Sequence, residues 1–265
     1  MVETGGAAIV TGASGGIGRA IAVRLAADGY AVICGYRTSA ASAEATVAEI
    51  ASFGGRAVTQ CVDVTSESDV ARLVSAAVDR FGRLDTLVNS AGVNRMAGGA
   101  ELSFDEWRSI LDVNLDGPFL CARHAVPAMR AGGGGVIVNI GSVASRLAPV
   151  GASAYAAAKA GLLAFGRTLA GEVAGFGIRV VTCTPGMVET EMTRRTFSAD
   201  RGGRLGRIAL GRFGRPEEIA AAVSFLASPA ASYVTGTEFE VTGGLYAVQD
   251  VAVPARVPAE QGGQQ

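Results

Sequence analysis

The sequence predicts an α/β fold, a doubly wound parallel sheet of about seven strands with helices on both faces. Short apolar runs alternate with longer amphipathic stretches along almost the whole chain, which is typical of a parallel sheet. The first apolar run leads through a glycine-rich loop directly into a helix. The 265 residues, 49% of them hydrophobic, suit one large core, so we expect a single domain over 1–250. Residues 251–265, rich in Pro, Gln and Gly, are expected to form a flexible tail.

The strands are predicted from apolar runs, and a stretch of helical periodicity follows each run. Ser66 is placed to cap the helix expected at 67–81, and Pro216 starts the one expected at 217–226. Other helices are predicted after the first glycine loop and at 40–53, 104–129 and 153–174. The predicted strands are 7–11, 31–35, 57–62, 84–88, 136–140, 178–184 and 237–241.

Charge and polar composition exclude several classes of function. The formal net charge is −1, which gives no general attraction for nucleic acid or a membrane surface. No signal peptide is visible and no apolar stretch is long enough to span a bilayer, so we expect a cytoplasmic protein. His124 is the only histidine and is interpreted as structural, so no Ser-His-Asp triad or metal site is predicted. The four cysteines, at 34, 61, 121 and 183, lack zinc-site spacing, and the three in or beside apolar strand-like runs are expected to be reduced core thiols.

Gly12, Gly16 and Gly18 lie in the loop between the first strand and the first helix. Such a loop places backbone N–H groups at a helix N-terminus, where they can bind an anion. The spacing G-x3-G-x-G differs from the commoner dinucleotide fingerprint G-x-G-x-x-G. The loop therefore favours a dinucleotide pyrophosphate, with a plain glycine-rich turn as the alternative.

The residues after the second strand favour NADP(H) over NAD. An acidic residue there would bind the ribose 2′-hydroxyl of NAD, whereas a basic residue would accept the 2′-phosphate of NADP. Here Arg37 follows the strand, Thr38 adds a hydroxyl, and no carboxylate is present. A solvated Arg37 is the alternative.

Tyr155 and Lys159 are four residues apart and share one face of a predicted helix. Lys159 is the only lysine in a chain with 23 Lys and Arg residues. A nearby ammonium lowers the pKa of a phenol, which would let Tyr155 transfer a proton near neutral pH. Ser142 ends the preceding strand and could hold a substrate oxygen beside it. A chance pairing on an Ala-rich helix is the alternative.

Residues 11–18, Thr-Gly-Ala-Ser-Gly-Gly-Ile-Gly, together with Tyr155-x3-Lys159, resemble the short-chain dehydrogenase/reductase family. The resemblance covers residues 5 to about 248, with 13 residues from Ser142 to Tyr155. Ser90 departs from the usual Asn-Asn-Ala-Gly pattern at 89–92. The resemblance implies a Rossmann-type fold and a cofactor site whose residues are Gly12, Ser14, Gly16, Ile17, Gly18, Arg37, Thr38, Asp63, Val64, Asn89, Ala91, Gly92, Tyr155, Lys159, Pro185, Gly186, Val188 and Thr190.

The same resemblance implies a catalytic set of Asn114, Ser142, Tyr155 and Lys159. Tyr155 would exchange a proton with the carbonyl or alcohol oxygen, and Ser142 would donate to the same oxygen. Lys159 would hold the nicotinamide ribose. Asn114 would kink the long helix and support a water in a proton path.

Segments 185–193, 211–219 and 241–246 resemble the 3-oxoacyl-[acyl-carrier-protein] reductase branch of the family. This implies reduction of a β-keto thioester, linked to acyl carrier protein or CoA, or of a polyketide-type ketone. Members of this branch often have basic residues in the turns before the fifth and sixth strands. Here only Arg130 is present in these turns, which weakens the expectation that a carrier protein docks there. Substrate contacts are expected from Ser142, Tyr155, Asn94, Arg95, Arg146 and Met187.

Residues 193–215 contain seven arginines and one acid, in the interval where the family has its substrate lid. A basic lid would suit an anionic substrate or a phosphate-bearing carrier. A solvated arginine surface is the alternative. The family also implies a homotetramer or homodimer, built on the helices at 104–129 and 153–174.

Two other functions remain open. The first is a secondary-alcohol or sugar dehydrogenase that works in the oxidative direction with NAD(P). The second is a catalytically silent NADP-binding regulator, since a fold does not fix a function. Such a dehydrogenase would be distinguished by its choice of cofactor, and Arg37 argues against NAD. A silent regulator would be expected to lack part of the catalytic set, which is complete here.

Overall fold

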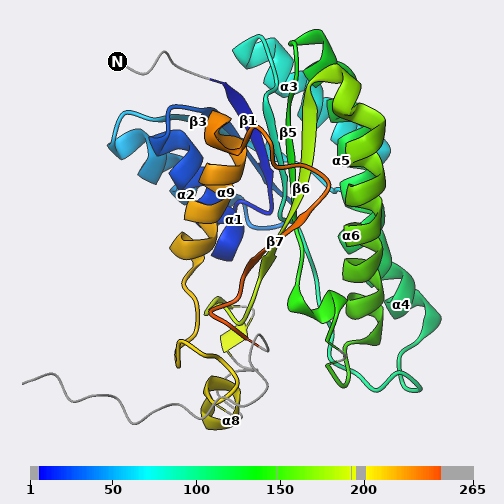
Figure 1. The fold of residues 1–265 in the computed structure, drawn as a ribbon. Coiled ribbons are helices and arrows are strands. Elements are labelled where there is room, and N and C mark those ends of the chain that lie inside the picture. Colours follow the sequence, from blue (N-terminus) through cyan, green and yellow to red (C-terminus); the bar gives the residue numbers. More distant parts are fainter. Residues whose placement is uncertain (1–5, 148, 192, 195–200, 246–265) are drawn as a thin grey trace, which may run out of the picture.

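The computed structural model describes residues 6–147, 149–191, 193–194 and 201–245. Seven parallel strands form one sheet in the order β3-β2-β1-β4-β5-β6-β7 (Figure 1), which confirms the predicted doubly wound sheet. The predicted tail at 251–265 lies outside the described residues, as do Arg195 and Asp200. The strands are β1 Ala7–Thr11, β2 Ala31–Tyr36, β3 Arg56–Cys61, β4 Thr86–Asn89, β5 Gly135–Ile140, β6 Ile178–Pro185 and β7 Glu238–Val241.

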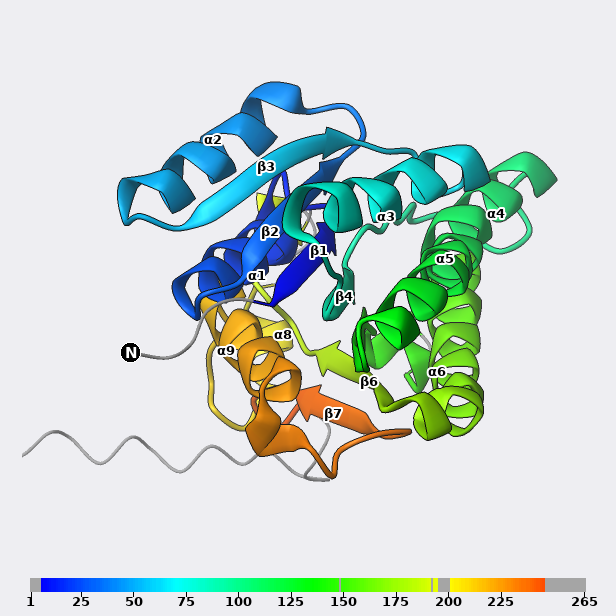
Figure 2. The same cartoon turned by 90° about the horizontal axis from the view of Figure 1, so that it is seen from above.

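Helices cover both faces of this sheet (Figures 1 and 2). One face carries α1 Gly16–Ala27, α2 Ala40–Ser52 and α9 Pro216–Ala227. The other face carries α3 Glu67–Phe81, α5 Gly117–Ala131 and α6 Ser153–Val173. Two further helices, α4 Phe104–Leu111 and α8 Arg201–Leu205, precede α5 and α9 in the chain.

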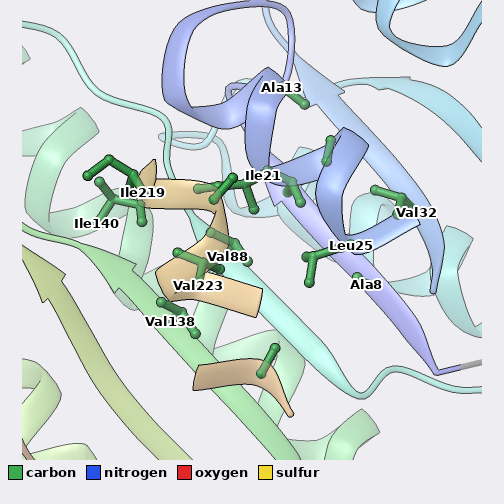
Figure 3. Close-up of a cluster of buried hydrophobic side chains, with 14 of the residues drawn as sticks. Ala8, Ala13, Ile21, Leu25, Val32, Val88, Val138, Ile140, Ile219 and Val223 are labelled. Atoms are coloured by element: carbon green, nitrogen blue, oxygen red, sulfur yellow. The ribbon is translucent and has the colours of Figure 1, made fainter. Parts of the chain in front are cut away.

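Two apolar clusters fill the spaces between the sheet and its helices. Figure 3 shows the cluster in which Ile21 and Leu25 of α1 and Val223 of α9 pack against Val88 and neighbouring strand residues. The second cluster packs the opposite strand face against α3, α5 and α6. Because successive side chains of a strand point to opposite faces, burial on both faces requires continuous apolar runs. This explains why short apolar runs identified the strands in the sequence.

Capping residues set several helix boundaries. The Ser66 hydroxyl accepts a hydrogen bond from the Asp69 N–H and caps α3, as predicted. Ser103 and Glu106 form a capping box at the start of α4. Pro216 occupies the first position of α9, also as predicted.

The helical stretch predicted over 104–129 is interrupted at Asn114, where the resemblance implied a kink. It is divided into α4, a π-helical turn at Asp112–Asp116, and α5. Asn114 lies inside the π-helical turn, and its side-chain amide donates to the backbone oxygens of Ile110 and Val93, each at 2.8 Å. Such turns occur often at functional sites.

The parallel arrangement brings the carboxyl ends of the strands to one edge of the sheet. The glycine loop after β1, the segments after β4 and β5, and the loop after β6 all start at this edge. Among the helices in the described part of the chain, none is long and apolar enough to cross a membrane.

Candidate active site

The glycine loop after β1 has a shape that only glycine permits. Gly12 and Gly16 have φ values of 71° and 52°, in the left-handed region. A Cβ on Gly18 would lie 2.3 Å from the Gly12 carbonyl oxygen, so the start of α1 packs directly on the loop. A Cβ on Gly15 would meet nothing within 4 Å, which leaves the backbone at the N-terminus of α1 accessible. The loop therefore fits an anionic group such as a pyrophosphate.

We expect Gly18→Ala to lower the free energy of unfolding by about 2 kcal/mol, because the new methyl group overlaps a backbone oxygen. Gly171→Ala in α6 is the matched control, since a Cβ there meets nothing within 4 Å and alanine favours a helix. Urea denaturation of both variants measures the difference. Equal stability of the two would contradict this account of the loop.

Thr11, at the end of β1, connects the glycine loop to the segment after β4. Its Oγ1 accepts hydrogen bonds from the backbone N–H groups of Ser90 at 3.0 Å and Ala91 at 3.1 Å. A Cβ on Gly12 would lie 3.0 Å from Ala91 Cα. The sequence analysis did not single out Thr11, although a polar residue ending an apolar strand was a usable signal.

Arg37 lies beyond the end of β2, where the adenosine end of a dinucleotide is expected. Its Nη1 is 4.0 Å from Asp63 Oδ2, and both side chains are partly exposed. A groove of about 330 Å³ starts at Arg37 and runs toward α4. The groove is lined by Arg37, Thr65, Val93, Asn94, Arg95, Ser109, Ile110, Asp112 and Val113.

Cys61 is exposed, and its thiol lies 3.7 Å from the backbone oxygen of Arg37. Cys34, Cys121 and Cys183 are buried, and burial raises the pKa of each to about 12. We therefore expect a maleimide to label one thiol of the folded protein, and NADPH to slow that labelling. Mass spectrometry counts the adducts, and Cys61→Ser is the control that should take none. More than one rapid adduct would contradict the assignment.

Asn114 is fully buried in the π-helical turn. Its amide nitrogen is satisfied, but its Oδ1 has no hydrogen-bond partner among the described residues. A Cβ on Gly92 would lie 2.9 Å from this oxygen and 4.0 Å from Lys159 Nζ. Glycine at 92 therefore leaves space between the amide oxygen and the ammonium. A buried polar atom without a protein partner fits a bound water.

Ser142 follows β5 and begins the 3-10 turn Val143–Ser145. Its Oγ accepts a hydrogen bond from the Ala144 N–H at 3.1 Å, and its backbone oxygen accepts one from the Ser145 hydroxyl at 2.8 Å. The Ser142 hydroxyl is also close enough to the Tyr155 phenol to lower its pKa. The two predicted oxygen-binding groups are thus side by side.

Lys159 is buried one helical turn from Tyr155 on α6. Its Nζ donates to the Ile140 backbone oxygen at 2.8 Å and lies 5.6 Å from the centre of the Tyr155 ring. Burial lowers the pKa of Lys159 to about 8. The ammonium of this single lysine is thus held between the Tyr155 ring and the end of β5.

The predicted lowering of the Tyr155 pKa by Lys159 is wrong for this structure. Burial raises the Tyr155 pKa above its ordinary value, and the nearby Ser142 hydroxyl offsets this only in part. The physical reason is that Lys159 donates to the Ile140 backbone oxygen and lies 5.6 Å from the centre of the Tyr155 ring, while burial of the phenol itself dominates. At neutral pH the phenol is therefore protonated.

The loop after β6 passes close to the glycine loop. Thr190 Cγ2 would be 3.5 Å from a Cβ on Gly16. Val188 pairs with Gly214 in an isolated parallel bridge, and Met187 packs on a small cluster of Ile208, Phe213 and Leu245. The predicted cofactor residues of this loop therefore face the same edge as the glycine loop.

Acidic partners offset much of the predicted positive charge of residues 193–215. Arg201 pairs with Glu189 at 2.7 Å, and Arg212 pairs with Glu218 at 2.6 Å. Arg215 lies 3.9 Å from the same Glu218. Both glutamates flank the interval, so counting charges inside it overstated the local charge.

Two of the predicted substrate residues are held by ion pairs. Arg95 pairs with Glu106 at the start of α4. Arg146 pairs with Glu238 and Glu240 of β7, both at 2.5 Å. Asn94 lies beside Arg95 in the groove that starts at Arg37. The sequence analysis did not single out Glu238.

Comparison with known proteins gives a consistent result. A family model described as Enoyl-(Acyl carrier protein) reductase matches residues 12–246. The chain is 41% identical over 239 residues to a 3-oxoacyl-[acyl-carrier-protein] reductase of Synechocystis, covering 90% of this chain and 96% of that protein. It is 41% identical over 248 residues to one from Salmonella typhimurium, covering 94% and 100%.

Solved structures with the same fold are also similar in sequence. A putative short-chain dehydrogenase/reductase from Burkholderia xenovorans has a TM-score of 0.88 and 39% identity, over 93% of this chain and 98% of that one. A putative NAD(P) dependent gluconate 5-dehydrogenase from Beutenbergia cavernae, with NADP bound at low occupancy, has a TM-score of 0.87 and 38% identity over the same shares.

Proposed function

Because the chain belongs to the short-chain dehydrogenase/reductase family, we propose that it is an NADPH-dependent ketoreductase acting on a 3-oxoacyl thioester or a related polyketide-type ketone. The observation that carries the proposal is the arrangement of the Tyr155 phenol beside Ser142, with buried Lys159 one helical turn away and 5.6 Å from the ring centre. A neutral phenol is prepared to donate a proton, which reduction of a ketone requires.

NADPH, when bound, supplies the hydride. The glycine loop would hold its pyrophosphate through backbone N–H groups, and Arg37 with Thr38 would hold the 2′-phosphate. Asp63 and Val64 would contact the adenine. Further contacts would come from Ser14, Ile17, Asn89, Ala91, Gly92, Pro185, Gly186, Val188, Thr190 and Lys159.

In the reduction, negative charge develops on the substrate carbonyl oxygen. Tyr155 donates a proton to this oxygen, and Ser142 donates a hydrogen bond to it. Lys159 would bind the nicotinamide ribose and stabilise the phenolate left after proton transfer. A water on Asn114 Oδ1 would connect Lys159 with solvent and restore the proton.

The names of the relatives support a thioester on acyl carrier protein as substrate. The ion pairs of Arg201 and Arg212 weaken the case for carrier docking through the arginine-rich segment, so a CoA-linked or free ketone stays within the proposal. We also expect a cytoplasmic homotetramer or homodimer. Phe119 of α5 and Phe104 of α4 are exposed, as an interface on this face would require.

A panel of ketones tests this proposal with NADPH and, separately, with NADH. It contains acetoacetyl-CoA, acetoacetyl-carrier protein, a cyclic diketone and a sugar-derived ketone. Absorbance at the reduced nicotinamide band follows turnover. We expect the thioesters to be reduced fastest and NADPH to be preferred. Arg37→Leu should reduce this preference by about 10- to 100-fold, because it removes a charge-assisted contact, while Arg72→Leu on α3 should leave it unchanged.

The other outcomes distinguish the remaining functions. The name of the Beutenbergia cavernae structure favours a sugar dehydrogenase as the second candidate. Preference for the sugar-derived ketone with NADH would support that candidate and reject the thioester reductase. Tight NADPH binding without turnover of any ketone would support a silent regulator.

A further inference from the structure

Glu238 is a buried carboxylate at the edge of the sheet. Its side chain is 2% exposed, although β7 is the last strand of the sheet. Oε1 accepts a hydrogen bond from Thr184 Oγ1 at 2.8 Å, and Oε2 pairs with Arg146 Nη2 at 2.5 Å. Burial of a carboxylate is costly unless it is paired and hydrogen-bonded. Glu238 therefore depends on Arg146 and Thr184.

Both terminal nitrogens of Arg146 bind carboxylates of β7. Nη1 binds Glu240 Oε1 at 2.5 Å, while Nη2 binds Glu238. The two glutamates are two residues apart, so both project from the same face of the strand. A guanidinium bound by two carboxylates on one rigid strand has a fixed position.

This cluster connects β7 with the turn that contains Ser142. Arg146 follows the 3-10 turn Val143–Ser145, and its backbone N–H donates to the Val143 oxygen. Ser142 begins the same turn. Thr184, the other partner of Glu238, would lie 2.7 Å from a Cβ on Gly141, directly before Ser142. The cluster thus holds the Ser142 turn from both of its sides.

The hydrogen bonds inside the turn do not provide this anchor. The N–H groups of Ala144, Ser145, Arg146 and Leu147 donate only to Ser142 or Val143, within the turn itself. These bonds fix the local shape of the turn. At its start, the Gly141 N–H donates to the Cys183 oxygen of β6 at 2.8 Å, which leaves the end of the turn to be held. Arg146 joins the end of the turn to β7.

We propose that Arg146 is a positioning residue, which through buried Glu238 holds the Ser142 hydroxyl against Tyr155. The expected effect of Arg146 on turnover rests on the proposed ketoreductase function. It assigns Arg146 to the support of the turn rather than to the wall of the substrate pocket.

The first test needs no substrate. Hydrogen exchange of the four turn amides is compared between the wild type, Arg146→Met and Arg83→Met. Arg83 pairs with the largely buried Asp85 at 2.5 Å, just before the central strand β4 and at its amino end, and is the matched control. We expect exchange in the turn to accelerate at least about 10-fold in Arg146→Met and to remain unchanged in Arg83→Met. Unchanged exchange in Arg146→Met would overturn the proposal.

The second test asks whether the effect passes through Ser142. Arg146→Met should lower kcat about 10-fold or more, with NADPH affinity within about 3-fold of the wild type. In a Ser142→Ala background the same substitution should have little further effect on kcat. An equal loss in both backgrounds would overturn the proposal, because Arg146 would then act elsewhere.

Adding Glu238→Gln to Arg146→Met provides a third comparison. It removes the unpaired buried charge that Arg146→Met creates, so thermal stability should recover, but kcat should not. Recovery of kcat together with stability would show a purely structural role and overturn the proposal. If the wild type reduces no ketone, the proposed function fails, and the exchange experiment alone decides whether Arg146 holds the turn.

Discussion

Tyr155→Phe is expected to lower kcat for ketone reduction by about 10³-fold, because it removes the proton donor and keeps the ring. Without the phenol, negative charge on the substrate oxygen would be met only by Ser142. Binding of NADPH should stay within about 3-fold of the wild type, because the glycine loop and the Arg37 region are untouched. Stopped-flow absorbance gives the rate, and fluorescence titration gives the affinity.

Tyr233→Phe is the matched control for this prediction. The Tyr233 side chain is fully exposed, so its hydroxyl should contribute to neither turnover nor stability. A Tyr155→Phe enzyme that retained more than about one tenth of the wild-type kcat would need a different proton donor. Loss of NADPH affinity together with kcat would show instead that the substitution disturbs the cofactor site.

Lys159→Met is expected to lower kcat by at least about 10²-fold and, at neutral pH, to stabilise the protein without cofactor. The loss of activity follows from removing the charge that stabilises a Tyr155 phenolate. The gain in stability follows because wild-type Lys159 is charged while buried. Lowering its pKa from 10.5 to about 8 corresponds to about 3 kcal/mol, of which the lost hydrogen bond to Ile140 offsets about 1 kcal/mol.

The lowered pKa of Lys159 also determines how the free energy of unfolding changes with pH. Between pH 8 and 10.5 the unfolded chain keeps the Lys159 proton and the folded protein does not, so wild-type stability gains with rising pH. The advantage of Lys159→Met should therefore shrink across this window. Buried Cys34, Cys121 and Cys183 act in the opposite direction above pH 9, but equally in both proteins, so they cancel in the difference.

Urea denaturation at pH 7, 8, 9 and 10 measures the difference between the two proteins. Lys159→Arg serves as the control, because it keeps a charge that cannot be neutralised in this range. It should be inactive and should show no stabilisation at pH 7. A difference between wild type and Lys159→Met that does not change with pH would mean that burial does not perturb the ammonium.

The sequence predicted those parts of the fold that depend on local pattern. Strands buried on both faces appear as unbroken apolar runs, and capping residues such as Ser66 mark helix ends. The π-helical turn could not be found this way, because it depends on what Asn114 contacts across the structure. Local pattern alone continues the helix from 104 to 129, and only the family resemblance implied a kink at Asn114.

The candidate site shows the same division. Residue type and spacing identified Tyr155, Lys159 and Ser142, and the structure places them together. The pKa of Tyr155 was predicted in the wrong direction, because proximity in sequence shows neither burial nor the hydrogen bond from Lys159 to Ile140. Partners far away in the chain were equally invisible: Glu238 lies 92 residues from Arg146, and together they form one ion pair.

The π-helical turn makes this enzyme sensitive to a change of chain length at one place. A π-helical turn contains one residue more than the α-helical turn it replaces. Losing a single residue between 112 and 116 would allow α4 and α5 to merge into a regular helix, with the flanking apolar faces still able to pack. The Asn114 oxygen would then rotate away from Gly92 and Lys159. A deletion that the fold could absorb would thus remove the polar atom that faces the ammonium.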